Sequence, residues 1–247
     1  MSTKYVINEK FNNLKDKLLD IKTVFSSSNK SIHKARNELK VINIKGLSSV
    51  IKSFKVPNIF NQIVYAYFRD SKAKKSYNYS LKIGKFTPQP ISYIEFYRFG
   101  LLKESYFTSE HFNYDFTIRE PLLESDFKDR EKIFQAFARF TLELHNSGIF
   151  HNDYSPGNIL IKKEADNYIF KIVDINRMMF YALNQEDRAK NFSKLWADNE
   201  ILKTIATEYI THYPCDEIFL DRVLYHSNHN KKVKNFKKRL KGKEVVD

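Results

Sequence analysis

The fold is decided by the stretch from Leu144 to Ile161, which reads LHNSGIFHNDYSPGNILI. A helix end, a polar loop and an apolar strand follow one another within it, and Gly148 marks the end of the helix. The polar loop carries His151, Asp153 and Asn158 in the spacing H-x-D-x-x-x-x-N. Given the numbers of His, Asp and Asn in the chain, this spacing is expected roughly 0.03 times by chance. The spacing of these three residues is therefore not expected to arise by chance.

A second candidate polar residue, Asp174, lies at the end of a later apolar run. Asp174 closes the run Lys171-Ile172-Val173 and lies sixteen residues after Asn158. Amide and carboxylate oxygens suit Mg²⁺, which needs few protein ligands beside phosphate oxygens and waters. Asp153 could accept the proton of an attacking hydroxyl, as in a phosphotransferase catalytic loop, and His151 is expected to order the loop. The alternative is a solvated turn, since Asn, Asp, Ser, Pro and Gly favour turns, but it leaves Asp174 unexplained.

The rest of the chain predicts an α+β fold with a β-rich first half and a mostly helical second half. Neither internal repeats nor a Gly/Ser linker interrupts it, so lobes are favoured over separate domains. The expected elements are a hairpin over 36–55 with its turn at Lys45-Gly46, helices within 59–83, strands over 91–99 and 104–114 around a turn at 100–103, a helix over 129–147, strands over 159–161 and 168–173, and helices over 188–224.

A phosphotransferase also needs a cation for the α- and β-phosphates of the nucleotide. Lys52 lies in the run Val50-Ile51-Lys52, on the second strand of the predicted hairpin, and Lys55 is the competing candidate. Alternation places Val50 and Lys52 on one face of that strand, but it does not say which face meets the nucleotide. A solvated strand lysine is the simpler alternative.

Composition limits the class of protein. The chain has 247 residues, a net charge of +13, 42% hydrophobic residues and 15% aromatic residues, which excludes wholesale disorder. Its one cysteine, Cys215, excludes an internal disulfide and a thiolate zinc site, and favours a reducing cytoplasm. No apolar run is long enough for a signal sequence or a membrane span.

Much of the positive charge lies at the C-terminal end. Residues 231–243 contain eight basic side chains and no acidic one. On a helix, Val233, Phe236 and Leu240 would share one face, which would suit peripheral contact with an anionic membrane. A nucleic acid would attract the same charges, and a solvated disordered tail is the plain alternative.

These motifs together resemble the protein-kinase-like superfamily, and within it the bacterial lipopolysaccharide (Kdo/heptose) kinase family. The resemblance rests on the run from Leu144 to Leu160, on Val50-Ile51-Lys52, on Thr87-Pro88-Gln89-Pro90 and on Val173-Asp174-Ile175-Asn176-Arg177. It spans about residues 20–225, and it implies a two-lobed kinase-like fold. The expected division is an N-lobe over 1–113, a C-lobe with the catalytic and metal loops over 114–230, and a basic tail over 231–247.

The resemblance also implies roles for individual residues. Asp153 would be the catalytic base, Asn158 and Asp174 the Mg²⁺ ligands, and Lys52 the lysine that binds the ATP phosphates. Glu110 and Phe112 would lie near the hinge that meets adenine through its backbone. The implied reaction is transfer of the γ-phosphoryl of ATP to a hydroxyl of an inner-core sugar of lipopolysaccharide. The implied location is the cytoplasm, with peripheral contact at the inner-membrane face, and the basic tail is not expected to bind nucleic acid.

Several positions depart from the protein-kinase pattern. No glycine precedes Lys45, so a Gly-rich phosphate loop is absent from the sequence. Asn78 stands where a glutamate that pairs with the lysine is expected. Ile175-Asn176 replaces Phe-Gly after Asp174, and Ser155 stands where protein kinases that phosphorylate serine and threonine carry lysine. These last two changes favour a sugar acceptor over a regulated protein acceptor.

Three rival functions remain open from the sequence. An atypical protein kinase would use the same Asp153 on a polypeptide hydroxyl. A catalytically weak pseudokinase scaffold would fit the absent glycine loop and Asn78. A basic nucleic-acid module would use the C-terminal lysines, and its binding would depend steeply on salt.

Overall fold

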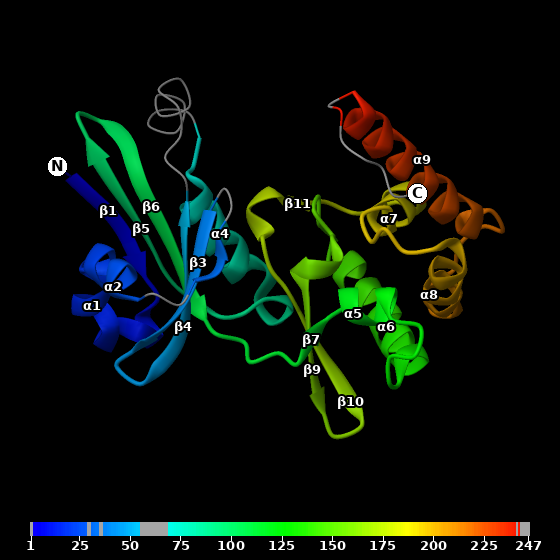
Figure 1. The fold of residues 1–247 in the computed structure, drawn as a ribbon, viewed down its shortest axis with the longest axis horizontal. Coiled ribbons are helices and arrows are strands. Elements are labelled where there is room, and N and C mark those ends of the chain that lie inside the picture. The colour runs from blue at the N-terminus through cyan, green and yellow to red at the C-terminus, as the bar shows by residue number, and fades with distance from the viewer. Residues whose placement is uncertain (1, 29–30, 35–36, 55–68, 241, 243–247) are drawn as a thin grey trace. The chain divides into compact units, whose positions relative to one another are not determined.

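The chain folds into two compact units, residues 1–113 and residues 114–247. The first unit is an antiparallel sheet with helices, and the second unit is mainly helical (Figure 1). The structure is a computed structural model that describes residues 2–28, 31–34, 37–54, 69–240 and 242.

The first unit is built on a six-stranded antiparallel sheet with the strand order β1-β5-β6-β4-β3-β2. Its strands are β1 Ser2–Ile7, β2 Ser31–Lys34, β3 Asn37–Ile44, β4 Leu47–Phe54, β5 Pro90–Arg98 and β6 Leu101–Glu110. The predicted hairpin is confirmed, because Lys45 and Gly46 both take positive φ between β3 and β4. Two consecutive residues with positive φ give a tight turn that matches the right-handed twist of the strands.

Each face of this sheet packs against helices from a different part of the chain. Ile51 and Ile94 belong to the core cluster that also contains buried residues of η1 (Glu9–Leu14), α1 (Lys15–Leu19) and α2 (Ile21–Ser27). Phe54 and Tyr93 pack in a second cluster with α4 (Lys72–Ile83). Because side chains alternate along a strand, the cluster of Phe54 lies on the opposite face from that of Ile51.

Some element boundaries in the first unit differ from the predictions. The predicted turn at 100–103 is wrong, since the chain turns at Phe99 and Gly100, both with positive φ, and β6 already begins at Leu101. Within the predicted helical region, residues 59–68 lie outside the described part of the chain and 72–83 are helical. Strand β1, which pairs with β5, was not predicted, because a short strand without a turn on either side gives little sequence signal.

The second unit contains small sheets and packed helices. Strands β10, β9 and β7 form one sheet, and β11 pairs with β8 in another. The elements are β7 Phe116–Thr117, α5 Arg119–Leu123, α6 Arg130–Asn146, β8 Ile149–Phe150, η3 Pro156–Asn158, β9 Ile159–Glu164, β10 Asn167–Ile172, η4 Ile175–Arg177, β11 Met179–Phe180, α7 Gln185–Phe192, α8 Asn199–Thr211 and α9 Phe219–Arg239.

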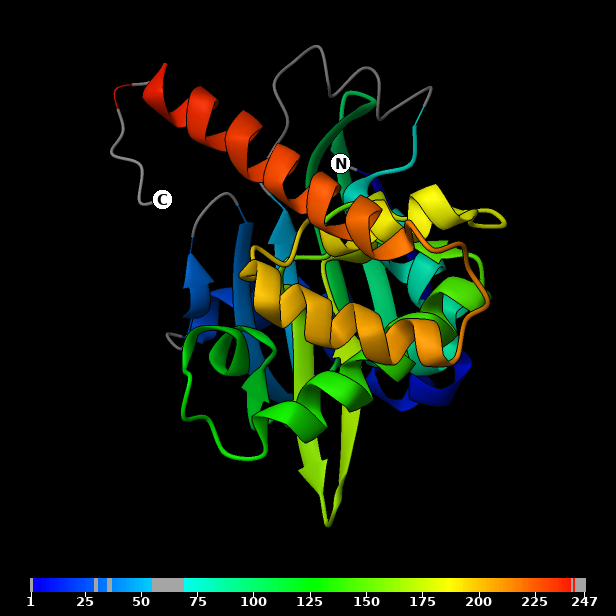
Figure 2. The same ribbon diagram turned by 90° about the vertical axis from the view of Figure 1, so that its right-hand side faces the viewer.

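The helices of the second unit follow the predicted periodicity. Helix α6 is confirmed, with Ile133, Phe137 and Leu144 fully buried along one face. It packs against α8, and α9 packs against α7 and α8 (Figure 2). The basic segment from Lys231 is helical as far as Arg239, because α9 continues through it. No helix in the described ranges has the length and apolar character needed to cross a membrane.

Gly148 connects α6 to β8 and makes a close contact with the chain before α7. Its φ is +70°, and its carbonyl oxygen accepts a hydrogen bond from the backbone N–H of Tyr181 at 3.0 Å. A Cβ atom at this position would lie 2.9 Å from the carbonyl oxygen of Tyr181. Only glycine meets both requirements without strain.

We therefore predict that Gly148→Ala lowers the free energy of unfolding by about 1–3 kcal/mol, from the positive φ and the contact with Tyr181. Chemical denaturation measures the change. Gly46→Ala is the matched control, because Gly46 also has positive φ but has nothing within 4 Å of its Cβ position. An equal loss in the two variants would contradict the proposed contact.

Candidate active site

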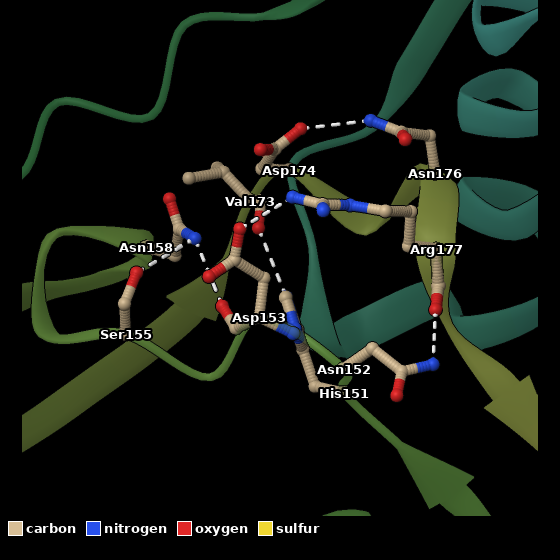
Figure 3. Close-up of polar contacts among 9 residues, drawn as sticks. All are labelled: His151, Asn152, Asp153, Ser155, Asn158, Val173, Asp174, Asn176 and Arg177. Atoms are coloured by element: carbon tan, nitrogen blue, oxygen red, sulfur yellow. Dashed lines mark hydrogen bonds and ion pairs between the residues drawn. The ribbon is translucent and has the colours of Figure 1, made fainter. Parts of the chain in front are cut away.

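The loop from His151 to Asn158 leaves β8, passes through η3 and enters β9. Its first residue, His151, is 1% exposed. The Nδ1 atom of His151 accepts a hydrogen bond from the backbone N–H of Asp153 at 3.0 Å. Its Nε2 atom lies 3.0 Å from the carbonyl oxygen of Val173 (Figure 3). Since Nδ1 accepts, Nε2 carries the proton and donates it to Val173.

The imidazole of His151 therefore joins two loops as a neutral group. Burial lowers the pKa of His151, because the imidazolium would lose its hydration without gaining a second acceptor. The ring holds the backbone of Asp153 on one side and the strand end before Asp174 on the other. The prediction that His151 orders the loop is confirmed.

Asp153 is the predicted catalytic base, and its side chain is 35% exposed. Its Oδ2 atom lies 2.6 Å from a guanidinium nitrogen of Arg177, at the end of η4. The side chain of Asn152 donates to the carbonyl oxygen of Arg177 at 2.7 Å. These two contacts tie the catalytic loop to the turn after Asp174, as Figure 3 shows. The ion pair occupies one carboxylate oxygen and fixes the orientation of the other.

Asn158, the first predicted Mg²⁺ ligand, has both amide hydrogens in use. Its Nδ2 atom donates to the carbonyl oxygen of Asp153 at 2.9 Å and to Oγ of Ser155 at 3.0 Å. The orientation of the amide group is therefore fixed, with Oδ1 as its acceptor atom. The carbonyl oxygen of Asn158 accepts from the N–H of Val173 at 2.9 Å, which continues the β9–β10 ladder by one step.

That backbone bond brings the second predicted ligand next to the first. Asp174 follows Val173 directly and has φ 56° and ψ 45°, a left-handed conformation that Asp tolerates better than most residues. Its Oδ1 atom accepts a hydrogen bond from Nδ2 of Asn176 at 2.8 Å, and Asn176 is buried. The turn directs the carboxylate of Asp174 to the side where Asn158 and Asp153 lie (Figure 3).

The donors gathered here are oxygen atoms, which fit a hard divalent cation. Within the described residues, no group of three or more His, Cys, Asp or Glu side chains forms a metal-ligand cluster. A cation held by Asn158 and Asp174 would therefore complete its coordination with phosphate oxygens and waters. This requirement suits Mg²⁺ better than zinc, which prefers a closed tetrahedral set of nitrogen and sulfur ligands.

A buried polar network supports the loop from behind. Asn191 of α7 donates to the carbonyl oxygen of His151 at 2.9 Å, and its Oδ1 atom lies 3.1 Å from Nε2 of His145. The Nδ1 atom of His145 lies 2.9 Å from the hydroxyl of Tyr209, and Arg188 donates to the same hydroxyl. Burial lowers the pKa of His145 to about 3. Helices α6, α7 and α8 are thus joined to the catalytic loop through Asn191, the neutral ring of His145 and Tyr209, with the guanidinium of Arg188 beside them.

The remaining predicted site residues belong to the first unit. Lys52 lies on the same face of β4 as Phe54, with its Nζ atom 5.4 Å from the centre of the Phe54 ring. That face packs against α4. The competing candidate, Lys55, lies outside the described residues. The placement of Asn78 as the helix residue that faces the lysine is wrong, because Asn78 lies on the exposed side of α4 and Ser76 and Ser80 lie on its buried side.

The predicted adenine segment is found at the end of β6. The backbone N–H of Glu110 donates to the carbonyl oxygen of Gln89 at 2.9 Å, and the backbone N–H of His111 donates to the carbonyl oxygen of Ser48 at 3.0 Å. Phe112 follows outside the strand and is half-buried. In the described part of the chain, the backbone N–H of Phe112 is the one of these three without a main-chain partner.

Residues 121–210 match the family model described as the lipopolysaccharide kinase (Kdo/WaaP) family. This match agrees with the family that the sequence resembles. A solved structure titled "WaaP in complex with acyl carrier protein" is similar to the chain over 93% of this chain and 99% of that chain, with a TM-score of 0.59 and 16% sequence identity. This similarity confirms the kinase-like α+β fold. No curated protein matches the chain by sequence.

The matched family is one of ATP-dependent kinases, so the coarser prediction of a kinase agrees with the comparisons. Sequence reasoning missed Arg177 and Asn191 as parts of the site. Arg177 stands in the quoted metal segment, but nothing in its spacing indicates an ion pair with Asp153. Asn191 lies forty residues after His151, and only the packing of α7 brings it to the loop.

The buried histidine network predicts how stability depends on pH. His145 is neutral in the folded chain and has a pKa of about 3, whereas an unfolded histidine titrates near 6.5. The stability that this difference contributes is fully present above about pH 6.5 and is lost as the pH falls toward 3. One proton taken up on unfolding corresponds to a slope of about 1.4 kcal/mol per pH unit below about pH 6.

We predict that His145→Gln reduces the slope of the unfolding free energy against pH by about 1.4 kcal/mol per pH unit between about pH 5 and pH 6, which corresponds to one proton. Chemical denaturation at several pH values measures the slope, and an unchanged m-value shows that both proteins unfold to a similar extent. Equal slopes in the wild type and in His145→Gln would contradict the assignment of a buried neutral histidine.

Proposed function

We propose that the chain transfers the γ-phosphoryl group of ATP to a hydroxyl of an inner-core sugar of lipopolysaccharide, either Kdo or heptose, with Mg²⁺. The observation that carries this proposal is the single backbone frame shared by Asp153, Asn158 and Asp174. His151 and the bond from Val173 to Asn158 hold that frame together. Phosphoryl transfer needs positioned oxygens and few covalent steps, which such a frame supplies.

Asp153 would orient the acceptor hydroxyl and take its proton. Arg177 holds Oδ2 of Asp153, so in the described part of the site Oδ1 is the oxygen that remains for the acceptor. The guanidinium also keeps the carboxylate in one rotamer before the acceptor arrives. A fixed base avoids the entropy cost of ordering during the reaction.

Asn158 and Asp174 would hold the metal through Oδ1 and the carboxylate. When bound, Mg²⁺ would offset the negative charge of the β- and γ-phosphates. Asn176 keeps the Asp174 carboxylate oriented by donating to its Oδ1 atom, and Ser155 does the same for the Asn158 amide by accepting from Nδ2. Both ligands are therefore held in position without the metal.

The first unit would bind the nucleotide. Lys52 would contact the ATP phosphates from β4, and the end of β6 would meet adenine through its backbone. Glu110 and Phe112 bracket that end, and the N–H of Phe112, which has no main-chain partner among the described residues, is the donor best suited to an adenine nitrogen. The side chain of Glu110 is not required for this contact.

The sugar acceptor is supported by the lipopolysaccharide kinase family and by the residues around Asp174. Ile175-Asn176 follows Asp174 in place of the Phe-Gly segment that switches in regulated protein kinases, and Asn176 is buried and donates to Asp174. A glycolipid acceptor would also make use of the basic part of α9, through peripheral contact at the cytoplasmic face of an anionic membrane.

The direct test is transfer of labelled phosphate from ATP to lipopolysaccharide precursors, with and without Mg²⁺. We predict that Asp153→Asn lowers kcat by about 10²–10⁴, because the base is lost while the side chain keeps its shape. Asp166→Asn, in the exposed turn between β9 and β10, is the matched control and should keep full activity. Unchanged transfer in Asp153→Asn would contradict the assigned role.

The same assay separates the rival functions. Label on a protein substrate and none on glycolipid would favour an atypical protein kinase. ATP binding with no transfer to any acceptor would favour a pseudokinase scaffold, which the absence of a carboxylate along α4 also favours.

A further inference from the structure

The turn between α7 and α8 presents the chain's one tryptophan, and it follows closely after Asn191, which donates to the carbonyl oxygen of His151 in the catalytic loop. Trp196 has φ +60°, which is rare for a bulky side chain, and it is half-buried. Its neighbours Leu195 and Ala197 are both buried, so they anchor the turn. Trp196 is therefore not a fully buried core residue.

Helix α9 places a lysine over this tryptophan. The Nζ atom of Lys234 lies 4.3 Å from the centre of the Trp196 ring. The helix is fixed to the turn on both sides of the ring, since Asn230 donates to the carbonyl oxygen of Ser193 and Lys231 donates to that of Ala197, both at 2.8 Å. A lysine stem held over an aromatic face has few alternative positions.

Further positive charge surrounds Lys234. The Nζ atom of Lys194, in the same turn, lies 3.4 Å from Oδ1 of Asn230, which carries no charge. Within the described residues, no carboxylate lies within ion-pair distance of Lys194 or Lys234. The pKa of Lys234 is lowered, first by partial desolvation and then by the charge of Lys194, with Lys238 adding to the effect. A set of repelling cations gains stability from any anion that enters between them.

This cation cluster lies within electrostatic range of the candidate base. Asp153 is the carboxylate that interacts with Lys234 at longer range. Because Arg177 pairs with Asp153, part of the negative charge of this carboxylate is offset. Between Arg222 and Lys243 the sequence contains no acidic residue. The surface beside the base is therefore positive.

We propose that Lys234, oriented by Trp196 and assisted by Lys194, binds an anionic group of the acceptor, either a carboxylate or a phosphate, beside Asp153. This inference rests on the proposed function, because it names the part of the acceptor that the same site recognises. The bound anion would place a neighbouring hydroxyl of the acceptor near Asp153. Lys234 is thus an acceptor-binding residue, and Trp196 is a positioning residue that acts through it.

A general membrane attraction is a weaker account of Lys234. Membrane binding uses many exposed lysines that need no fixed position. Lys232, Lys234 and Lys237 are all exposed, but among these three, in the part of the chain that the structure describes, Lys234 is the one held over an aromatic ring. Lys234 has a defined position because its ammonium group lies over the Trp196 ring and because Asn230 and Lys231 fix its helix to the backbone of the turn.

Trp196 allows a direct test that does not depend on catalysis, since its fluorescence reports on this position alone. The full chain is titrated with mannose 6-phosphate, with neutral mannose and with vesicles that contain phosphatidylglycerol. We predict a saturable change with mannose 6-phosphate and none with mannose. Lys234→Ala should weaken the response about tenfold, the size expected for one charge-assisted contact, and Lys232→Ala should leave it unchanged.

Each outcome decides the proposal. Loss of the response in Lys234→Ala alone supports it, and a tenfold higher acceptor KM with unchanged kcat and unchanged KM for ATP would support it further. Equal weakening in Lys232→Ala, a response to vesicles but not to mannose 6-phosphate, or no response to any anion would overturn it. Phosphoryl transfer without an anion response contradicts this inference alone, whereas an anion response without transfer supports it and counts against the proposed function.

Discussion

The candidate site depends on the buried imidazole of His151. This neutral ring accepts from the N–H of Asp153 and donates to the carbonyl oxygen of Val173, so it links the two loops that carry the reacting groups. Without it, the catalytic loop and the turn at Asp174 would be joined by the ladder bond to Asn158, by the exposed hydrogen bond from Asn152 to Arg177 and by a partly exposed ion pair. Exposed ion pairs contribute little to stability, whereas hydrogen bonds between buried groups fix geometry.

The polar loop could be predicted from the sequence because its geometry is local. The spacing of His151, Asp153 and Asn158 fixes their order along one loop, and the apolar runs on either side become β8, β9 and β10 with α6 before them. The hairpin at Lys45-Gly46 was predictable for the same reason, since a tight turn between two β-rich runs permits few pairings. Asp174 could be added because it ends the strand that pairs with β9.

Contacts between distant segments could not be read from the sequence. Arg177 and Asn191 reach the site from η4 and α7, and Lys234 reaches the Trp196 ring from α9. No local pattern distinguishes these residues from ordinary surface or core residues. The face of α4 was misassigned at Asn78 because the helix has few large apolar residues, and its buried side includes Ser76 and Ser80. Serine at a buried position carries no periodic hydrophobic signal.

The most direct measurement of this account is the ¹⁵N NMR spectrum of the His151 imidazole as a function of pH. The expected result is a neutral ring protonated at Nε2, with Nδ1 unprotonated, whose pKa lies below the ordinary histidine value of about 6.5. A ring that becomes doubly protonated near pH 6.5, or a neutral ring protonated at Nδ1, would contradict it, because neither form can accept from Asp153 and donate to Val173.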